Sequence, residues 1–163
     1  MIMVFLALVG ACTSTPQVAL DHQTTAELSA RAVAEACGSD CDLLTVYVRD
    51  QHFYSDTLVG DEHAMRDETR TALTERFDEV EFVDMDDADR LVTDEYVVDD
   101  GDGVLISVSP VDQLADGVIG IEVGVTRFRD GYFGQTVQFK WDGETWVLAT
   151  SEDTGVTVVT SVS

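Results

Sequence analysis

The stretch that decides the fold is 118–150, VIGIEVGVTRFRDGYFGQTVQFKWDGETWVLAT. Apolar and polar residues alternate along it, which is typical of strands that bury one face. The pairs Asp130-Gly131 and Asp142-Gly143 interrupt the alternation and mark two hairpin turns. The stretch therefore predicts three antiparallel strands, Val118 to Phe128, Tyr132 to Trp141 and Glu144 to Thr150.

The register of the first hairpin follows from keeping its apolar residues on one face. A two-residue turn at Asp130-Gly131 would set Val123 opposite Gln138 and place the two apolar sets on opposite faces. A three-residue turn from Arg129 to a left-handed Gly131 repairs this, because a one-residue shift exchanges the faces. The second turn, Asp142-Gly143, needs no extra residue. The expected pairs are Val123–Val137, Ile121–Phe139, Ile119–Trp141, Phe139–Trp146 and Val137–Leu148.

Two helices are predicted before this sheet. Thr24 and Glu27 have the spacing of a capping box, and Gly38 ends the helix that follows. Asp61 to Phe77 reads as a second helix, since its apolar residues recur on one side. Flanking strands at Leu43 to Arg49 and Val80 to Asp84 predict a right-handed parallel crossover around it. The apolar stripe of the second helix is Met65, Ala72, Leu73 and Phe77.

The remaining elements complete an α+β fold. It has a mixed, mostly antiparallel sheet, with two helices on one face and one β-α-β crossover. Further β-segments are expected at Val104 to Ser109 and Val156 to Val162. The acidic tract from Asp84 to Asp102 is expected to lack stable structure over much of its length, apart from a short strand at Tyr96 to Val98. Glycines on the polar sheet face predict strand bending, with a flat binding floor as the alternative; they include Gly120, Gly124 and Gly134.

The first residues, MIMVFLALVGACTSTP, join a short apolar run to small residues, a cysteine and a polar stretch. Ile2 to Ala11 is about half the ~20 residues that a membrane-spanning helix needs, so its length is typical of a secretion signal. The quartet Val9-Gly10-Ala11-Cys12 resembles the lipobox of bacterial lipoproteins. The resemblance implies cleavage before Cys12 and a diacylglyceryl group on its thiol.

This resemblance predicts the organisation of the chain. Residues 1–11 form the signal peptide, 12–22 a lipidated tether, and 23–163 a single α+β domain. The protein is then expected in the cell envelope, held on the extracytoplasmic side of the membrane by its lipid anchor. The alternatives are a plain secretory signal and an apolar tail on a cytosolic domain.

The cysteine count agrees with export. Lipidation of Cys12 would leave Cys37 and Cys41, and in an oxidising compartment two nearby thiols on a small domain normally pair. Closing such a short loop adds roughly 2 kcal/mol to the free energy of unfolding, so the bond reinforces the fold but is not its main source of stability. A redox or metal-binding pair is the alternative, although redox motifs favour two intervening residues and zinc needs further ligands.

Composition limits the partners. The 163 residues carry 32 acids and 9 bases, a net charge of −23, and 45% are hydrophobic. A chain of this hydrophobicity can bury a core, whereas its charge repels nucleic acid and anionic lipid headgroups. Nucleic-acid binding is therefore excluded. The acid excess suits a salty medium, where ions screen self-repulsion.

Catalytic and metal-binding motifs are incomplete. Residues 98–109 and 84–95 match EF-hand loops only in part, because Val98 and Ala88 occupy positions that need oxygen ligands. His22, His52 and His63 are scattered, and no nucleophile elbow or phosphate-binding loop occurs. No catalytic residue, metal ligand or cofactor is predicted.

Two functions remain from the sequence. The first is a lipid-anchored envelope protein whose non-catalytic domain binds a protein or an envelope polymer. The second is a small pocket-forming protein or enzyme, because the element order resembles the nuclear-transport-factor-like cone folds. Those folds also begin with helices and end in a long antiparallel sheet with a late tryptophan, here Trp146. That resemblance implies a ligand site enclosed between helices and sheet.

Overall fold

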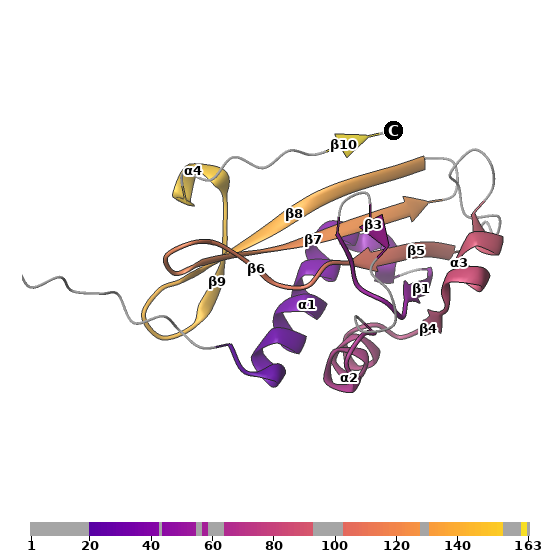
Figure 1. The fold of residues 1–163 in the computed structure, drawn as a ribbon, viewed down its shortest axis with the longest axis horizontal. Helices are drawn as coiled ribbons and strands as arrows, with labels where there is room; N and C mark the ends of the chain where they lie inside the picture. Colours follow the sequence, from indigo (N-terminus) through magenta and orange to yellow (C-terminus); the bar gives the residue numbers. More distant parts are fainter. Residues whose placement is uncertain are drawn as a thin grey trace, which may run out of the picture.

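The structure is a computed structural model that describes residues 20–42, 44–54, 57–58, 64–92, 103–127, 131–154 and 161–162. Helices and strands follow one another along the chain as Figure 1 shows. The elements are α1 His22–Cys37, the 3-10 helix η1 Gly38–Asp42, β1 Thr45–Arg49, β2 Phe53–Tyr54, β3 Thr57–Leu58, α2 Asp67–Arg76, β4 Val80–Val83, α3 Met85–Leu91, β5 Gly103–Val108, β6 Asp112–Ala115, β7 Val118–Arg127, β8 Gly131–Trp141, β9 Trp146–Ala149, α4 Ser151–Thr154 and β10 Ser161–Val162.

Among the described residues, eight strands form one mixed sheet. Its main order is β10-β8-β7-β5-β1-β4, with β6 beside β7 and β9 beside β8; β2 and β3 pair separately. The predicted crossover is confirmed by the parallel pairing of β1 with β4, in which Val46 lies opposite Val80. β5 is also parallel to β1, on its other side. The α+β class with a mostly antiparallel sheet is therefore confirmed.

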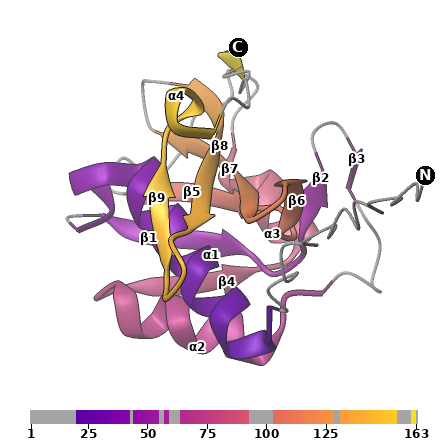
Figure 2. The same cartoon turned by 90° about the vertical axis from the view of Figure 1, so that its left-hand side faces the viewer.

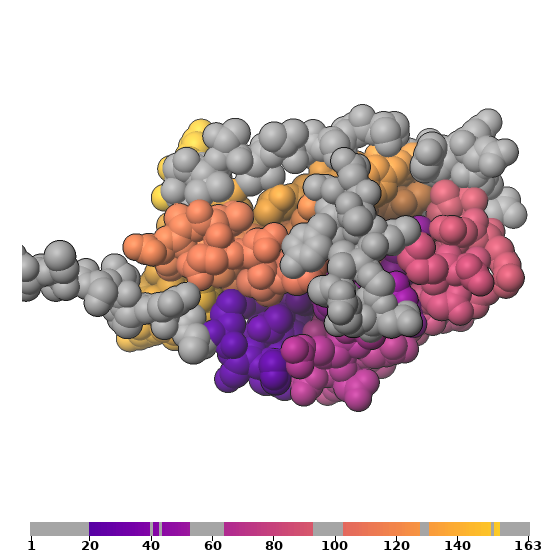
Figure 3. Space-filling view, in the orientation of Figure 1, coloured from indigo at the N-terminus to yellow at the C-terminus, as the bar shows by residue number. Residues whose placement is uncertain are grey.

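Helices α1 and α2 pack side by side on one face of the sheet (Figures 1 and 3), as predicted. Between them and the sheet lies a continuous apolar core. β1 and the C-terminal strands both supply this core, because their inward residues alternate with outward ones. Its largest fully buried side chains include Phe139, Leu28, Leu73, Ile106, Ile119 and Ile121.

Helix α1 begins earlier than its predicted cap. Asp21 is the N-cap, and its Oδ1 accepts the backbone N–H of Thr24 at 2.7 Å. The predicted capping box of Thr24 and Glu27 is therefore wrong, because Thr24 already lies inside the helix. At the other end Gly38 has a φ of 63°, and its N–H bonds to the carbonyl of Ala34. The predicted stop at this glycine is confirmed.

Helix α2 is shorter than the predicted helix from Asp61 to Phe77. Ala64 forms a β-bridge with Gln51, and the N–H of Met65 donates to the carbonyl of Asp50 at 2.7 Å. These contacts hold the chain against the end of β1, so the prediction is wrong for residues 64–66; residues 61–63 lie outside the described residues. The predicted apolar stripe is confirmed, with Met65, Leu73 and Phe77 buried and Ala72 packed against the core.

The acidic tract contains a helix that the sequence did not indicate. Asp84 caps α3, since its Oδ1 accepts the N–H of Asp87 at 2.8 Å. Ala88 is fully buried and packs with Leu105 on the sheet face opposite α1 and α2. The expectation of little stable structure is therefore wrong for Met85–Leu91. The rest of the tract, with its predicted strand at Tyr96 to Val98, lies outside the described residues.

The register of both C-terminal hairpins differs by two residues from the predicted pairs. β7 pairs with β8 through Ile121–Val137 and Ile119–Phe139, and β8 pairs with β9 through Phe139–Leu148 and Trp141–Trp146. A two-residue shift keeps every side chain on its face, so the predicted continuous apolar face is confirmed although the pairs are wrong. The predicted left-handed Gly131 is confirmed at φ 74°, but it lies within β8, opposite Arg127; residues 128–130 lie outside the described residues.

Local contacts explain both shifts. Oδ1 of Asp142 accepts the N–H groups of Glu144 and Thr145, which builds a four-residue loop in place of the expected two-residue turn. In the first hairpin Gly124 lies opposite Gly134. A Cβ at Gly124 would lie 2.9 Å from Cε2 of Tyr132. In the observed pairing the Tyr132 ring therefore occupies the space above Gly124. This part of the sheet face is covered and is not a flat binding surface.

Candidate functional site

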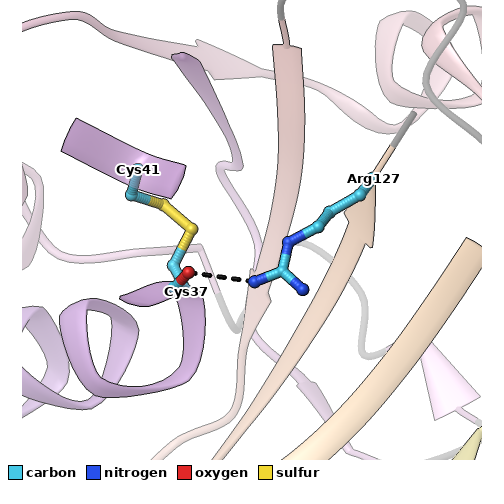
Figure 4. Close-up of a disulfide and its surroundings, with 3 residues drawn as sticks. All are labelled: Cys37, Cys41 and Arg127. Carbon is cyan, nitrogen blue, oxygen red and sulfur yellow. Dashed lines mark hydrogen bonds between the residues drawn. A yellow bond between two sulfur atoms is a disulfide. The ribbon is translucent and has the colours of Figure 1, made fainter. Parts of the chain in front are cut away.

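The predicted disulfide joins Cys37, the last residue of α1, to Cys41 in η1 (Figure 4). Gly38 lets the chain turn between them. Both cysteines belong to the apolar core, with exposed fractions of 1% and 2%. Thiol–disulfide exchange requires access to a sulfur atom, so this burial favours the structural role over the redox alternative. The bond fixes the passage from α1 into β1.

An arginine on the helix-facing side of the sheet contacts the same corner. Nη2 of Arg127, at the end of β7, donates to the carbonyl oxygen of Cys37 at 2.9 Å (Figure 4). Its guanidinium also lies 4.8 Å from the ring centroid of Phe133. Because the last carbonyls of a helix carry partial negative charge, the cation stabilises the end of α1. Arg127 contacts the backbone of Cys37 and therefore acts on the end of the helix.

A second arginine joins α1 to the last long hairpin. Nη1 of Arg31 donates to the carbonyl oxygen of Trp146 at 2.9 Å, and its guanidinium lies 5.0 Å from the ring centroid of Phe139. Trp146 in turn meets Trp141 edge to face, with 5.6 Å between ring centroids. Trp146 is buried, Trp141 is partly buried, and Leu148 is 45% exposed. We call Trp141, Trp146 and Leu148 the tryptophan end.

The basic residues are engaged by the protein itself. Arg129 lies outside the described residues, and each of the other bases contacts a protein group. Arginines that stack on rings or donate to carbonyls leave the carboxylates without compensating cations. The acidic surface therefore faces solvent as a net polyanion. The contacts are Arg31 and Arg127 to carbonyls, Arg49, Arg90 and Lys140 to Asp89, Asp87 and Asp153, Arg66 to His22, and Arg70 and Arg76 to Phe82 and Phe77.

Other polar groups are dispersed over the described residues. Nδ1 of His52 lies 3.1 Å from the carbonyl oxygen of Val108, whereas His22 lies beside Arg66 at the start of the helices. Burial lowers the pKa of Arg49, which pairs with Asp89 on α3. The described part of the chain holds no group of three or more His, Cys, Asp or Glu side chains placed to bind a metal ion. Its buried polar side chains are Ser29, Thr69, Ser109, Thr126 and Gln138.

The predicted lipidation site, Cys12, lies outside the described residues, as do His63 and most of the predicted tether. The last part of the tether is described: Leu20 packs against the apolar core, and α1 begins at His22. Within the described ranges no helix has the length and apolar character needed to span a membrane. The structure brings Cys37 and Cys41 together and places Leu20 at the beginning of α1.

Comparison with known proteins finds no matching family model, curated protein or solved structure.

Sequence reasoning did not identify Arg127 or Arg31 as structural contacts. A signal for Arg127 was present, because it lies on the same strand face as Ile121, Val123 and Val125. A charged residue at the end of an apolar strand face indicates an inward partner. Arg31 offers no such signal, since it lies on the exposed side of an amphipathic helix, where a charged residue is expected.

Proposed function

We propose that the protein is an exported, lipid-anchored cell-envelope protein whose α+β domain is a non-catalytic binding or accessory module. The proposal combines the lipobox-like quartet that ends at Cys12 with the buried Cys37–Cys41 disulfide. With Cys12 lipidated, the other two cysteines pair without a leftover thiol. Disulfides of this kind persist in oxidising compartments, so the pairing supports export.

The packing of the domain supports a binding or accessory role. Apolar side chains fill the space between α1, α2 and the sheet, and the buried polar side chains of the described residues are hydroxyls and one amide. General acid–base catalysis uses titratable groups held close to the substrate. A filled apolar core stabilises the fold and leaves recognition to the outer surface.

The test is the mass of the mature N-terminus, purified from bacterial membranes. We expect a chain that begins at Cys12 and carries a diacylglyceryl group on its thiol. Cys12→Ser should abolish the lipid, whereas Cys37→Ser with Cys41→Ser should leave it in place. An unprocessed chain that begins at Met1, recovered from the soluble interior without lipid, would contradict the proposal.

A further inference from the structure

We propose that the tryptophan end of the domain rests on the surface of a zwitterionic phospholipid bilayer. This proposal depends on the proposed lipid anchor at Cys12 and says which face of the domain the anchor presents to the membrane. Among the described residues, Leu148 is the most exposed of the large hydrophobic side chains, at 45%. It lies on the same face of the β8–β9 hairpin as the partly exposed Trp141, beside α1, whose Arg31 donates to the carbonyl oxygen of Trp146.

The position of this end follows from the strand pairings. Trp141 lies opposite Trp146 at the end of β8. The backbone N–H of Trp141 donates to the carbonyl oxygen of Gly117 in the β6–β7 turn at 2.8 Å. Leu148 lies two residues further along β9, on the same face. Figures 1 and 2 show that β9, the β6–β7 turn and the first turn of α1 gather at one end of the molecule.

The proposed tether keeps this end close to the lipid. Leu20 packs against the core just before α1 begins. The eight residue steps from Cys12 to Leu20 span at most about 29 Å when fully extended. That length is comparable to the diameter of a domain of this size, whose radius of gyration is about 14 Å. The start of α1 therefore stays within about 29 Å of the bilayer surface, which keeps the tryptophan end, at the same end of the molecule (Figures 1 and 2), within reach of the lipid.

The side chains at this end suit the bilayer interface. Tryptophan concentrates at the headgroup level, where its ring is partly in hydrocarbon and its N–H stays near water. An exposed leucine gains free energy when the bilayer covers it. One tryptophan and one leucine bind weakly in solution, but a short tether supplies an effective concentration in the millimolar range. A weak contact is then enough to orient the domain.

Charge decides which lipids fit. Exposed acids surround the tryptophan end at the tips of its two turns, namely Asp116, Asp142 and Glu144. They repel anionic headgroups, in the same sense as the net charge of −23. Zwitterionic headgroups lack this net repulsion. The contact is therefore expected on phosphatidylcholine, and on anionic vesicles only when salt has shortened the Debye length to about 3 Å near 1 M.

The experiment uses the chain that begins at Cys12, which contains every described element. With Cys37 and Cys41 oxidised, the thiol of Cys12 alone remains to couple to a maleimide lipid in phosphatidylcholine vesicles with brominated acyl chains. Bromine quenches nearby tryptophans, and the protein has two. We expect quenching in the wild type and much less in Trp141→Phe, where buried Trp146 alone reports.

Leu148→Ser and Val147→Ser form a matched pair on the exposed strand β9, since their side chains point to opposite faces. We expect Leu148→Ser to lower the equilibrium constant for contact about three- to tenfold, as loss of a half-covered leucine would. Val147→Ser should leave it unchanged. Circular dichroism checks that both variants are folded.

Equal quenching in the wild type and Trp141→Phe, or no effect of Leu148→Ser, would overturn the proposal. Quenching that follows protein density instead of lipid would do the same, because it would indicate a second copy at this surface. Chemical coupling makes the result independent of cellular lipidation. The mass of the mature N-terminus tests the proposed lipid anchor, and the quenching tests the contact between the tryptophan end and the bilayer.

Discussion

Removal of the Cys37–Cys41 disulfide should destabilise the domain by a small and calculable amount. The bond closes a loop with a sequence separation of 4. In the chain-entropy relation a five-residue loop corresponds to about 2 kcal/mol at 25 °C. For a domain of this size that amounts to a decrease in Tm of about 4–8 °C.

The assay is urea denaturation of three proteins: the oxidised wild type, the reduced wild type and the Cys37→Ala, Cys41→Ala double variant. Reduction removes the covalent link and keeps both sulfurs, so it measures the loop term. The double variant also loses two buried sulfurs and should be slightly less stable again, because it leaves a small cavity. Arg127 still reaches the end of α1 in all three proteins, so we expect a weakened fold that remains native.

Thiol counting provides the control. The denatured, unreduced full-length chain should show one free thiol, that of Cys12, and three after reduction; the lipidated chain should show none before reduction. Three free thiols without reduction would refute the assignment of the bond. A change in unfolding free energy well below 1 kcal/mol on reduction would refute the reasoning from loop entropy.

Three further predictions concern charge, packing and pH. Adding NaCl up to about 1 M should raise the urea midpoint steadily, because screening relieves the repulsion within a chain of net charge −23; a flat response would contradict this. Gly120→Ala should cost about 1–3 kcal/mol, since its Cβ would lie 2.8 Å from Cδ1 of Leu114 and 2.9 Å from Cγ2 of Thr136. Thr136→Ser, which removes that methyl, should restore part of the loss in a double-mutant cycle. Backbone N–H groups of Thr145 and Glu144 lower the pKa of Asp142. The stabilisation by the Asp142 carboxylate should be complete above the pKa of an aspartate in the unfolded chain, about 4. It should vanish as the pH falls through the lower pKa of Asp142 in the folded protein. The stability difference between wild type and Asp142→Asn should therefore shrink in acid.

Much of the architecture was predictable because its signals are local. Alternation over 118–150 indicated the strands and the face that each side chain takes, and Gly38 indicated the end of α1. Spacing alone also predicted the parallel crossover around the second helix. The disulfide was predictable for a similar reason, since Cys37 and Cys41 are only four residues apart in the sequence. The position of a candidate surface was not, because the β8–β9 hairpin that carries Trp141 and Leu148 meets α1, through Arg31 and Trp146, only in the folded chain.

The sequence by itself determined which face of each strand is apolar, because the two-residue period of a strand survives any even shift of register. Only the tertiary structure decided the pairs, since the Asp142 loop and the Tyr132 ring select one register from several with the same faces. It also decided that α3 forms in the acidic tract, because Ala88 is buried there against Leu105. The arginine contacts depend on the fold in the same way: Arg31 and Trp146 are 115 residues apart, and Cys37 and Arg127 are 90 apart. Contacts over such separations exist only once the chain has folded, so a local pattern can indicate that Arg127 points inward but cannot indicate its partner.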